Sequence, residues 1–266
     1  MGLFKKNKIK VRRRWNEKLE TRELPAVSKN PPCQVCNNCN HDTFFEQGSL
    51  LLLKCRECGL VFMHPLLQLD AMTAIYSHNY DGAGRKEKKM RRSRQRAAKI
   101  KRYSPGGRFL DIGSSGGFMV EAAREAGFES FGVELDPAAV EYARSHYPKN
   151  TYFTGRIEDF VGTTAGFDAV YCSEVIEHVS DLNSFVAAIA ALMKPGGIFY
   201  VTTPDISHWR RPKDLDAWDG FDPPSHCMYL TPSSLQRLLS KHGLDVFSKQ
   251  FAWKPGIKVF ARKRQG

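Results

Sequence analysis

The 266-residue sequence lacks any apolar run near the roughly 18 residues that a membrane-spanning helix needs. Its first ten residues carry lysines but no apolar core, and the sixth position lacks the Ser or Thr of a myristoylation site, so we expect neither a secretory signal nor lipidation. Collagen-like repeats and the cysteine density of a disulfide-stapled mini-protein are also missing. The hydrophobic share of 42% is enough to bury a core, which excludes disorder throughout.

Positive charge outweighs negative charge, and it is concentrated. The chain has 40 Lys and Arg against 28 Asp and Glu, yet residues 1–14 and 85–102 hold so many of the cations that the remainder is mildly acidic. Such blocks attract phosphate-rich partners, which include nucleic acid, an anionic membrane surface and a nucleotide-linked substrate. The alternative is a solvated tail and a solvated helix face. No aromatic residue interrupts 85–102, so that segment lacks the stacking platforms of a single-strand binder.

Five of the seven cysteines lie between Cys33 and Cys58. Two Cys-x-x-Cys pairs separated by fifteen residues have the spacing of a zinc site, and four thiolates leave no open position, so the zinc is expected to be structural. Asn40 and Gly59, which follow the two pairs, tolerate the positive φ that a metal knuckle needs. Cys33-x-x-Cys36 remains an alternative first pair. Free thiols beside a metal knuckle fit a reducing cytoplasm. The predicted ligands are Cys36, Cys39, Cys55 and Cys58.

Four regions follow from the pattern of apolar, charged and turn residues. We expect a basic, flexible tail over 1–30, a zinc ribbon over 31–64, a helical linker with a basic helix over 65–104 and an α/β domain over 105–266. Short apolar strands that alternate with amphipathic helices predict a Rossmann-like, mostly parallel seven-stranded sheet, and the short link between the last two strands predicts an antiparallel edge hairpin. The predicted strands are 108–112, 130–134, 151–154, 167–172, 197–202, 244–249 and 257–262, and the predicted helices are 118–126, 137–146, 182–193 and 232–242.

The first of these strands ends in Asp111-Ile-Gly113-Ser-Ser-Gly116-Gly117, immediately before a predicted helix. A glycine turn here is typical of nucleotide-binding sites, which lie at the carboxyl ends of the strands of an open sheet. Glu134 closes the second strand, 21 residues after Gly113, where a carboxylate can accept from both ribose hydroxyls. The glycine turn alone fits NAD equally well. The negative charge of Asp111, however, suits a cationic sulfonium–amino acid better than a pyrophosphate.

Five short segments carry a recognisable combination of residues: Leu110-Asp-Ile-Gly-Ser-Ser-Gly-Gly117, Gly132-Val-Glu134, Phe167-Asp168, Glu174-Val-Ile-Glu-His-Val179 and Leu192-Met-Lys-Pro-Gly-Gly197. Together they resemble class I S-adenosylmethionine-dependent methyltransferases over about 105–262. The segments Trp218-Asp-Gly-Phe-Asp-Pro-Pro-Ser-His226 and Leu230-Thr-Pro232 look like a bacterial subgroup with an N-terminal Cys-x-x-Cys ribbon, in which the spacing favours Cys36 and Cys39. Ser115 departs from the glycine that is frequent in the family, and a serine is tolerated there if its φ stays negative.

The resemblance implies S-adenosylmethionine as the cofactor and a residue for each of its parts. Asp111 and the backbone of Gly113, Ser115 and Gly117 would hold the methionine part, Glu134 the ribose, and Ile157 and Glu158 the adenine, while Ser173 and Glu174 would line the cleft near the methyl group and Tyr80 would help to close the pocket.

Glu174-x-x-Glu177-His178 places two carboxylates and an imidazole within one helical turn after the fourth strand. Methyl transfer to a hydroxyl or amine requires removal of a proton, and His178 is the first candidate for the base, with Glu174 and His226 as further catalytic candidates. Two alternatives stay open. One is a divalent ion at Glu174, Glu177, His178 and His226, as in relatives resembling quinone and RNA 2′-O-methyltransferases. The other is a structural brace formed by Glu177 and His178.

Residues 205–229 interrupt the α/β pattern with aromatic residues and prolines, and they are expected either to cover the acceptor or to form a packed connector. The leading hypothesis is O-methylation of a small molecule, sugar or glycan whose phosphates the basic segments attract. One alternative is an RNA methyltransferase that grips the backbone with the ribbon and the basic helix, for which salt dependence would be steep. Another is a non-catalytic scaffold that binds S-adenosylmethionine. Peripheral contact with an anionic membrane also stays open.

Overall fold

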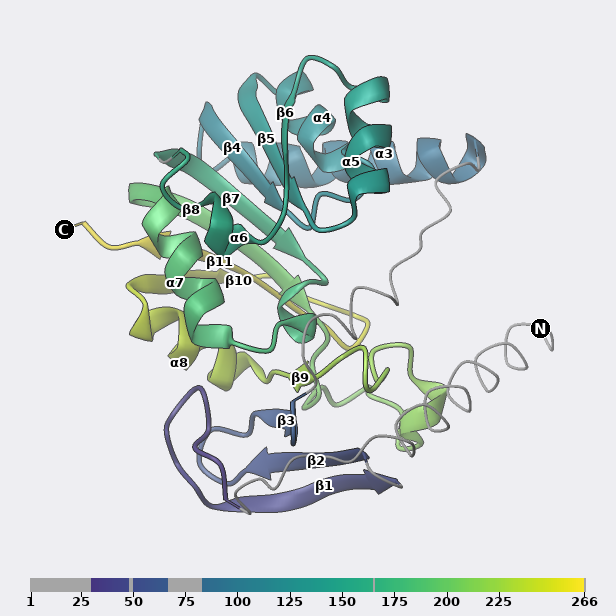
Figure 1. Ribbon diagram of the computed structural model, residues 1–266, viewed down its shortest axis with the longest axis vertical. Helices are drawn as coiled ribbons and strands as arrows, with labels where there is room; N and C mark the ends of the chain where they lie inside the picture. Colours follow the sequence, from purple (N-terminus) through teal and green to yellow (C-terminus); the bar gives the residue numbers. More distant parts are fainter. Residues whose placement is uncertain (1–29, 48–49, 67–82, 165, 266) are drawn as a thin grey trace.

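The computed structural model of the chain describes residues 30–47, 50–66, 83–164 and 166–265 (Figure 1). The basic tail predicted over 1–30, except for its last residue, lies outside the described residues, and so does Tyr80. Among the helices of the described ranges, none is long and apolar enough to cross a membrane.

A seven-stranded sheet organises the larger part of the molecule and confirms the predicted fold class (Figure 1). The strand order is β10-β11-β8-β7-β4-β5-β6. The five strands from β8 to β6 in this order are parallel, whereas β11 pairs antiparallel with both β8 and β10. The strands are β4 (Gly107–Ile112), β5 (Phe128–Glu134), β6 (Thr151–Thr154), β7 (Phe167–Ser173), β8 (Met193–Thr203), β10 (Leu244–Lys249) and β11 (Ile257–Lys263).

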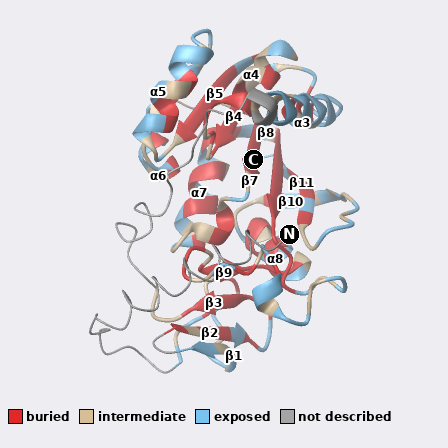
Figure 2. Cartoon of the chain, turned by 90° about the vertical axis from the view of Figure 1, so that its right-hand side faces the viewer, coloured by how far each residue is buried: buried red, intermediate tan, exposed pale blue. Residues whose placement is uncertain are grey.

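Alternate side chains of the central strands supply the two faces of this sheet. Leu110 of β4 and Phe199 of β8 belong to a core that includes residues of α7 and α8, whereas Phe109 and Tyr200 belong to a second core with residues of α3 and α4. Figure 2 shows the central strands and α7 as the buried interior. The helices are α3 (Ala83–Lys101), α4 (Phe118–Glu125), α5 (Pro137–His146), α6 (Ile157–Phe160), α7 (Leu182–Leu192) and α8 (Pro232–Lys241).

The basic helix α3 covers the sheet with a narrow stripe of its surface. Ala97 and Ile100 are buried in the core shared with α4, while most of the cations on the helix are exposed. Arg94 forms an ion pair with Glu125 of α4, with 2.6 Å between Nε and Oε2. The helix is therefore amphipathic: a small apolar stripe packs, and the charge faces solvent.

The cysteine-rich segment forms a second, smaller sheet, drawn below the large one in Figure 1. Its strands β1 (His41–Gln47), β2 (Leu50–Cys55) and β3 (Val61–Met63) pair antiparallel, and β9 (Met228–Tyr229) of the α/β part adds a fourth strand beside β3. One hydrophobic core runs from Leu52 and Phe62 in this ribbon to Phe199 in the large sheet. The ribbon is thus packed into the same core as the α/β part.

The segment 205–229 divides into two parts. Trp218 and Phe221 are buried, and the ring centroid of Phe221 lies 5.2 Å from that of Phe45 in β1. Trp209, in contrast, is 74% exposed. The later part of the segment therefore has the packing of a connector between the ribbon and the sheet, while the earlier part leaves a large aromatic ring in solvent.

Candidate active site

The turn after β4 requires glycine at two positions. Gly113 and Gly117 have φ values of 73° and 79°, which side chains with a Cβ rarely adopt. A Cβ at Gly113 would also collide with the side chain of Val175, and one at Gly117 would lie 2.6 Å from the hydroxyl of Tyr152. The turn is therefore compact: its backbone packs closely against the side chains of Val175 and Tyr152, and no side chain at Gly113 or Gly117 would fit between them.

Glu134, at the end of β5, fixes the other side of this turn. Its Oε2 accepts from the N–H of Ser115 at 2.8 Å, and its Oε1 accepts from the N–H groups of Leu135 and Asp136 at 2.8 and 3.1 Å. Ser115 has a φ of +48°, so the condition of a negative φ is not met, and its hydrogen bond to Glu134 holds it in the left-handed region. The carboxylate is thereby oriented before any ligand binds.

A cavity of about 540 Å³ opens between the ends of β4, β5 and β7, within the range typical of small-molecule sites. It brings together eight of the predicted site residues: Gly113, Ser115, Glu134, Ile157, Glu158, Ser173, Glu174 and His178. Sequence reasoning did not identify Leu135, Val175, Ser180 and Phe185, which also line it. Of these, Leu135 could have been identified from the sequence, because it is an apolar residue that directly follows Glu134, and in the structure it is 41% exposed.

Asp111 and Gly117 lie behind the turn and do not line the cavity. Asp111 is only 3% exposed, and burial raises the pKa of its carboxyl group well above the usual value, with a further contribution from the negative charge of Glu134 and an opposing one from Arg96. A cationic ligand in the cavity would stabilise the negatively charged form of Asp111, whereas a pyrophosphate would destabilise it further. The residues present therefore fit a sulfonium–amino acid of the S-adenosylmethionine type.

A second group of polar side chains lies at the far wall of the cavity and behind it: Glu174 and His178 line the cavity, whereas Glu177 and His226 do not. Glu174 has a φ of 57°, an uncommon value for a residue with a side chain, and its Oε1 accepts from the hydroxyl of Thr202 at 3.2 Å. Glu177 is buried; its Oε2 accepts from the hydroxyl of Thr203 at 3.0 Å, and its Oε1 has no hydrogen-bond partner among the described residues. Burial, and then the charge of Glu174, raise the pKa of Glu177 to about 8.

His178 and His226 lie together, with 4.6 Å between ring centroids. Nδ1 of His178 donates to the carbonyl of Ser225 at 2.7 Å, and Nδ1 of His226 donates to the carbonyl of Gly220 at 3.0 Å. Each bond fixes the tautomer, so Nε2 is the ring atom that can accept a proton or bind a cation. Burial lowers the pKa of both imidazoles, that of His178 to about 3, so both are neutral near pH 7.

The ligand atoms of Glu177, His178 and His226 lie within 4.8 Å of one another. Three of the four residues that the sequence predicted for a divalent-ion site therefore lie together, and the fourth, Glu174, does not. Glu174 lines the cavity beside this group and is not one of the three residues whose atoms converge.

The ribbon supports this wall of the cavity from two sides. The side-chain amide of Gln34 donates to the carbonyl of Ser180 and accepts from the N–H of Leu182, each at 2.7 Å. On the other side, the N–H of Met63 donates to the carbonyl of Cys227 at 2.8 Å, and the N–H of Cys227 donates to the carbonyl of Glu177 at 2.9 Å. The segment that carries Glu177 and His178 is thus held by hydrogen bonds that lead back to the ribbon.

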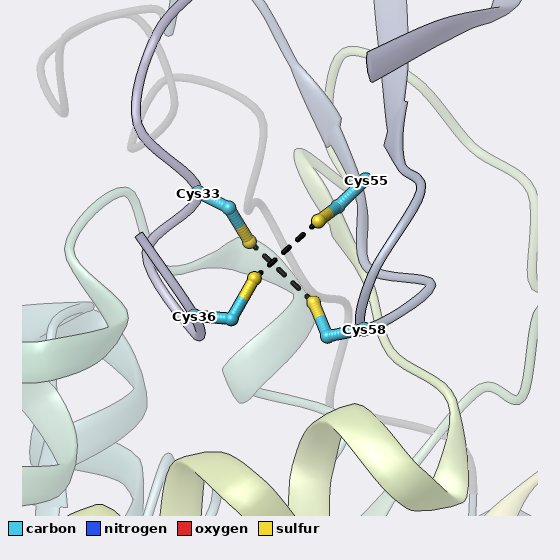
Figure 3. A group of neighbouring side chains, drawn as sticks. All are labelled: Cys33, Cys36, Cys55 and Cys58. Atoms are coloured by element: carbon cyan, nitrogen blue, oxygen red, sulfur yellow. Dashed lines mark hydrogen bonds between the residues drawn. The ribbon is translucent and has the colours of Figure 1, made fainter. Parts of the chain in front are cut away.

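Four cysteines of the ribbon converge, as Figure 3 shows. Sγ of Cys33 lies 3.5 Å from that of Cys58, and Sγ of Cys36 lies 3.4 Å from that of Cys55. Cys39, which the sequence placed in this set, is exposed, and its Sγ is directed to the carbonyl of Asn37.

The first pair that converges on Cys55 and Cys58 is therefore Cys33 and Cys36, and not Cys36 and Cys39 as predicted from the sequence. The physical reason is the choice of turn residue. Asn37, directly after Cys36, has a φ of 61° and its N–H donates to the carbonyl of Cys33, so the knuckle closes there and not at Asn40. Gly59, with a φ of 76°, plays the same part after Cys58.

The sheet with an antiparallel edge, the glycine turn after β4 and the carboxylate after β5 define a Rossmann-like, S-adenosylmethionine-dependent methyltransferase domain. The chain belongs to the methyltransferase domain family, whose sequence profile matches residues 83–249. The family predicted from the sequence motifs is thereby confirmed.

Curated relatives match a shorter stretch. The ubiquinone biosynthesis O-methyltransferase of Xanthomonas campestris pv. campestris (strain B100) is 38% identical over 104 residues, which cover 37% of this chain and 44% of the relative. The protein of the same name from Bordetella avium (strain 197N) is 40% identical over 103 residues, which cover 37% of this chain and 43% of that one. The chain thus matches less than half the length of these relatives.

Solved structures share the fold. The mitomycin 7-O-methyltransferase MmcR superposes with a TM-score of 0.55 at 21% identity, over 65% of this chain and 53% of that chain. An S-adenosylmethionine-dependent methyltransferase from Mesorhizobium loti superposes with a TM-score of 0.51 at 19% identity, over 64% of this chain and 96% of that chain. At these identities the similarity establishes the architecture only.

Proposed function

We propose that this protein transfers the methyl group of S-adenosylmethionine to a hydroxyl oxygen of a small molecule, sugar or glycan. The observation that carries the proposal is one cavity that joins a prepared cofactor turn to the side chains of Glu174 and of His178, which is neutral near pH 7. The names of the curated relatives, which are O-methyltransferases, support oxygen as the acceptor atom.

Within the proposal, each described residue has a defined task toward the cofactor. Glu134 would receive the ribose hydroxyls. Its carboxylate has about four lone-pair sites, of which three are used: one hydroxyl can donate to the remaining site on Oε2, and a hydroxyl that donates to Oε1 has to displace the N–H of Leu135 or Asp136. Asp111 would lie behind the cationic methionine part, Ile157 and Glu158 would flank the adenine, and Ser173 would lie near the methyl group. Tyr80 remains a proposed contact from outside the described residues.

S-adenosylmethionine supplies an electrophilic methyl group with a good leaving group, so the protein has to align the acceptor and manage its proton. His178 is neutral and its Nδ1 is bonded to Ser225, which leaves Nε2 as the atom that would take the acceptor proton. Its lowered pKa means that the base form is present throughout the physiological range.

The convergence of Glu177, His178 and His226 also supports a divalent cation at the same wall. Two imidazoles oriented through Nδ1 by backbone carbonyls, beside a buried carboxylate oxygen without a partner among the described residues, are the donor set of a divalent metal site. A cation there would make an acceptor hydroxyl more acidic. The structural brace remains the alternative in which these residues bind neither proton nor metal.

The His178→Ala variant tests the role of this wall. We expect the affinity for S-adenosylhomocysteine to stay within about threefold of the wild type, while transfer of a labelled methyl group to small molecules of a cell extract falls at least a hundredfold. His146→Ala, an exposed histidine outside the cavity, is the matched control. If a cation takes part, His178→Ala also weakens Mn²⁺ binding at least tenfold, which electron paramagnetic resonance measures.

The same labelling experiment separates the proposed function from its alternatives. Label in a base-stable small-molecule ether supports O-methylation, whereas label confined to RNA, with steep salt dependence, would replace it by RNA methylation. Absence of transfer to any fraction by a protein that binds the cofactor would favour a scaffold. Near-normal transfer by His178→Ala would assign the residue to the structural brace.

The cysteine cluster is proposed to hold a structural zinc ion through Cys33, Cys36, Cys55 and Cys58. A tetrahedral zinc with Zn–S bonds of about 2.3 Å needs sulfur atoms roughly 3.8 Å apart, close to the 3.4 and 3.5 Å separations of the two pairs. The hydrogen bond from Cys58 lowers the pKa of Cys33 to about 5, which favours a thiolate at that position.

A further inference from the structure

Three large aromatic side chains stand in solvent on two neighbouring loops. Trp209 follows β8 and is 74% exposed, while Phe251 and Trp253, between β10 and β11, are 79% and 61% exposed. The other large apolar residues that are exposed in the described chain are much less so, at 37 to 42%. Contiguous exposed apolar surface on a folded protein usually marks an interaction site.

The two loops are joined into one rigid feature, which we call the aromatic tip (Trp209, Arg210, Phe251 and Trp253). Nε2 of His208 donates to the carbonyl of Ala252 at 3.1 Å. The guanidinium of Arg210 lies 4.0 Å from the ring centroid of Trp253 and 5.2 Å from that of Trp209. In Figure 1 the turn between β10 and β11 lies beside the segment that follows β8. The rings are therefore held together by the fold.

The two loop segments that carry the tip, which lie between Asp205 and Asp214 and between β10 and β11, are positively charged. Residues 206–213 and 249–256 contain no aspartate or glutamate. They contain five cationic side chains, of which all but Arg211 are exposed: Arg210, Arg211, Lys213, Lys249 and Lys254. The two loops thus carry exposed apolar rings together with four exposed cations, of which Arg210 contacts the rings.

We propose that the aromatic tip docks on an anionic membrane surface. Tryptophan prefers the interface between water and lipid, phenylalanine inserts its ring below it, and lysine and arginine pair with anionic headgroups. This docking proposal is independent of the proposed reaction, because none of the residues of the aromatic tip lines the cavity of the active site.

The observations favour lipid over two other partners. Lysine is depleted in protein–protein interfaces, yet lysines flank the tip on both loops. Single-stranded RNA needs open ring faces along a groove, whereas the Arg210 guanidinium lies over both indole rings. The tip residues line neither the cavity of the active site nor the one beside α8. A projecting tip of rings and cations matches a flat anionic surface.

The test is co-sedimentation of the full chain with vesicles at physiological ionic strength. We expect binding to phosphatidylcholine vesicles that contain phosphatidylglycerol and none to phosphatidylcholine alone. The basic segments also attract anionic lipid, so the informative variant leaves every charge in place. Phe251→Ser combined with Trp253→Ser should weaken binding to the mixed vesicles at least about tenfold. Phe247→Ser, an exposed aromatic of the same hairpin outside the tip, should bind like the wild type.

Three results would overturn the proposal. Equal vesicle binding by the double variant and the wild type would assign the attraction to the basic segments. Loss of binding to a single-stranded RNA oligonucleotide, with vesicle binding unchanged, would make the tip an RNA contact. Loss of a dimer in sedimentation velocity, again with vesicle binding unchanged, would make it a contact between copies of the chain. Phe251→Ser alone, at the most exposed position, replaces the double variant if the latter does not fold.

Discussion

The Cys58→Ser variant is expected to lose the zinc ion proposed at the cysteine cluster and to unfold at a temperature about 6–12 °C below the wild type. Serine is a poor zinc ligand, and loss of a structural metal is among the largest effects that one substitution produces, about 3 kcal/mol or more. In a chain of this length, 1 kcal/mol corresponds to about 2–4 °C. Metal content by atomic emission spectroscopy and thermal unfolding by circular dichroism measure both changes.

The damage should extend beyond the ribbon. Cys33, Cys55 and Cys58 belong to the same hydrophobic core as Phe199 of the large sheet. Gln34, within the first knuckle, holds Ser180 and Leu182 at the wall of the active site. We therefore expect a single unfolding transition that shifts as a whole.

Cys39→Ser is the matched control and should change neither the zinc content nor the unfolding temperature, because Cys39 is exposed and stands outside the cluster. Cys33→Ser should behave like Cys58→Ser. The reverse pattern, with zinc lost from Cys39→Ser and retained by Cys33→Ser, would restore the ligand set expected from sequence spacing.

The Glu134→Gln variant is expected to bind S-adenosylhomocysteine about a hundredfold more weakly than the wild type. The change is nearly isosteric, but an amide nitrogen cannot accept a hydrogen bond, so either the N–H of Ser115 or those of Leu135 and Asp136 lose their acceptor. Hydrogen bonds to a charged group contribute about 1.5–3 kcal/mol each, and a hundredfold corresponds to about 2.8 kcal/mol.

Glu129→Gln provides the control for this measurement. Glu129 lies on the same strand, carries the same charge and pairs with Arg108 at 3.4 Å on the surface, outside the cavity. Isothermal titration calorimetry should give the wild-type dissociation constant for Glu129→Gln. An unchanged constant for Glu134→Gln would show that the ribose is held elsewhere.

The sequence predicted the large sheet well because its signal is local and repeated. Phe109 and Leu110 already show the alternation of two buried faces, and glycines at 113 and 117 already indicate a turn that no other residue adopts easily. Glu134 was found from its position at the end of the next strand. These features depend on residues that are neighbours in sequence or in adjacent strands.

What the sequence did not predict depends on contacts between distant segments. The strand β9 is only two residues long and exists because Tyr229 and Met228 pair with β3, about 165 residues earlier in the chain. The choice between Asn37 and Asn40 as the knuckle residue is likewise decided by the packing of the ribbon, since both are asparagines. The positive φ of Ser115 follows from its bond to Glu134, which spacing alone does not reveal.

The central claim is that the cavity beside Glu134 recognises an adenosyl sulfonium. Calorimetric titration of the folded wild-type protein tests it directly, with S-adenosylmethionine and S-adenosylhomocysteine in one series and NAD in another. The account predicts saturable heat with both adenosyl ligands and none with the dinucleotide. Tight binding of NAD, with no heat from either adenosyl ligand, would contradict it.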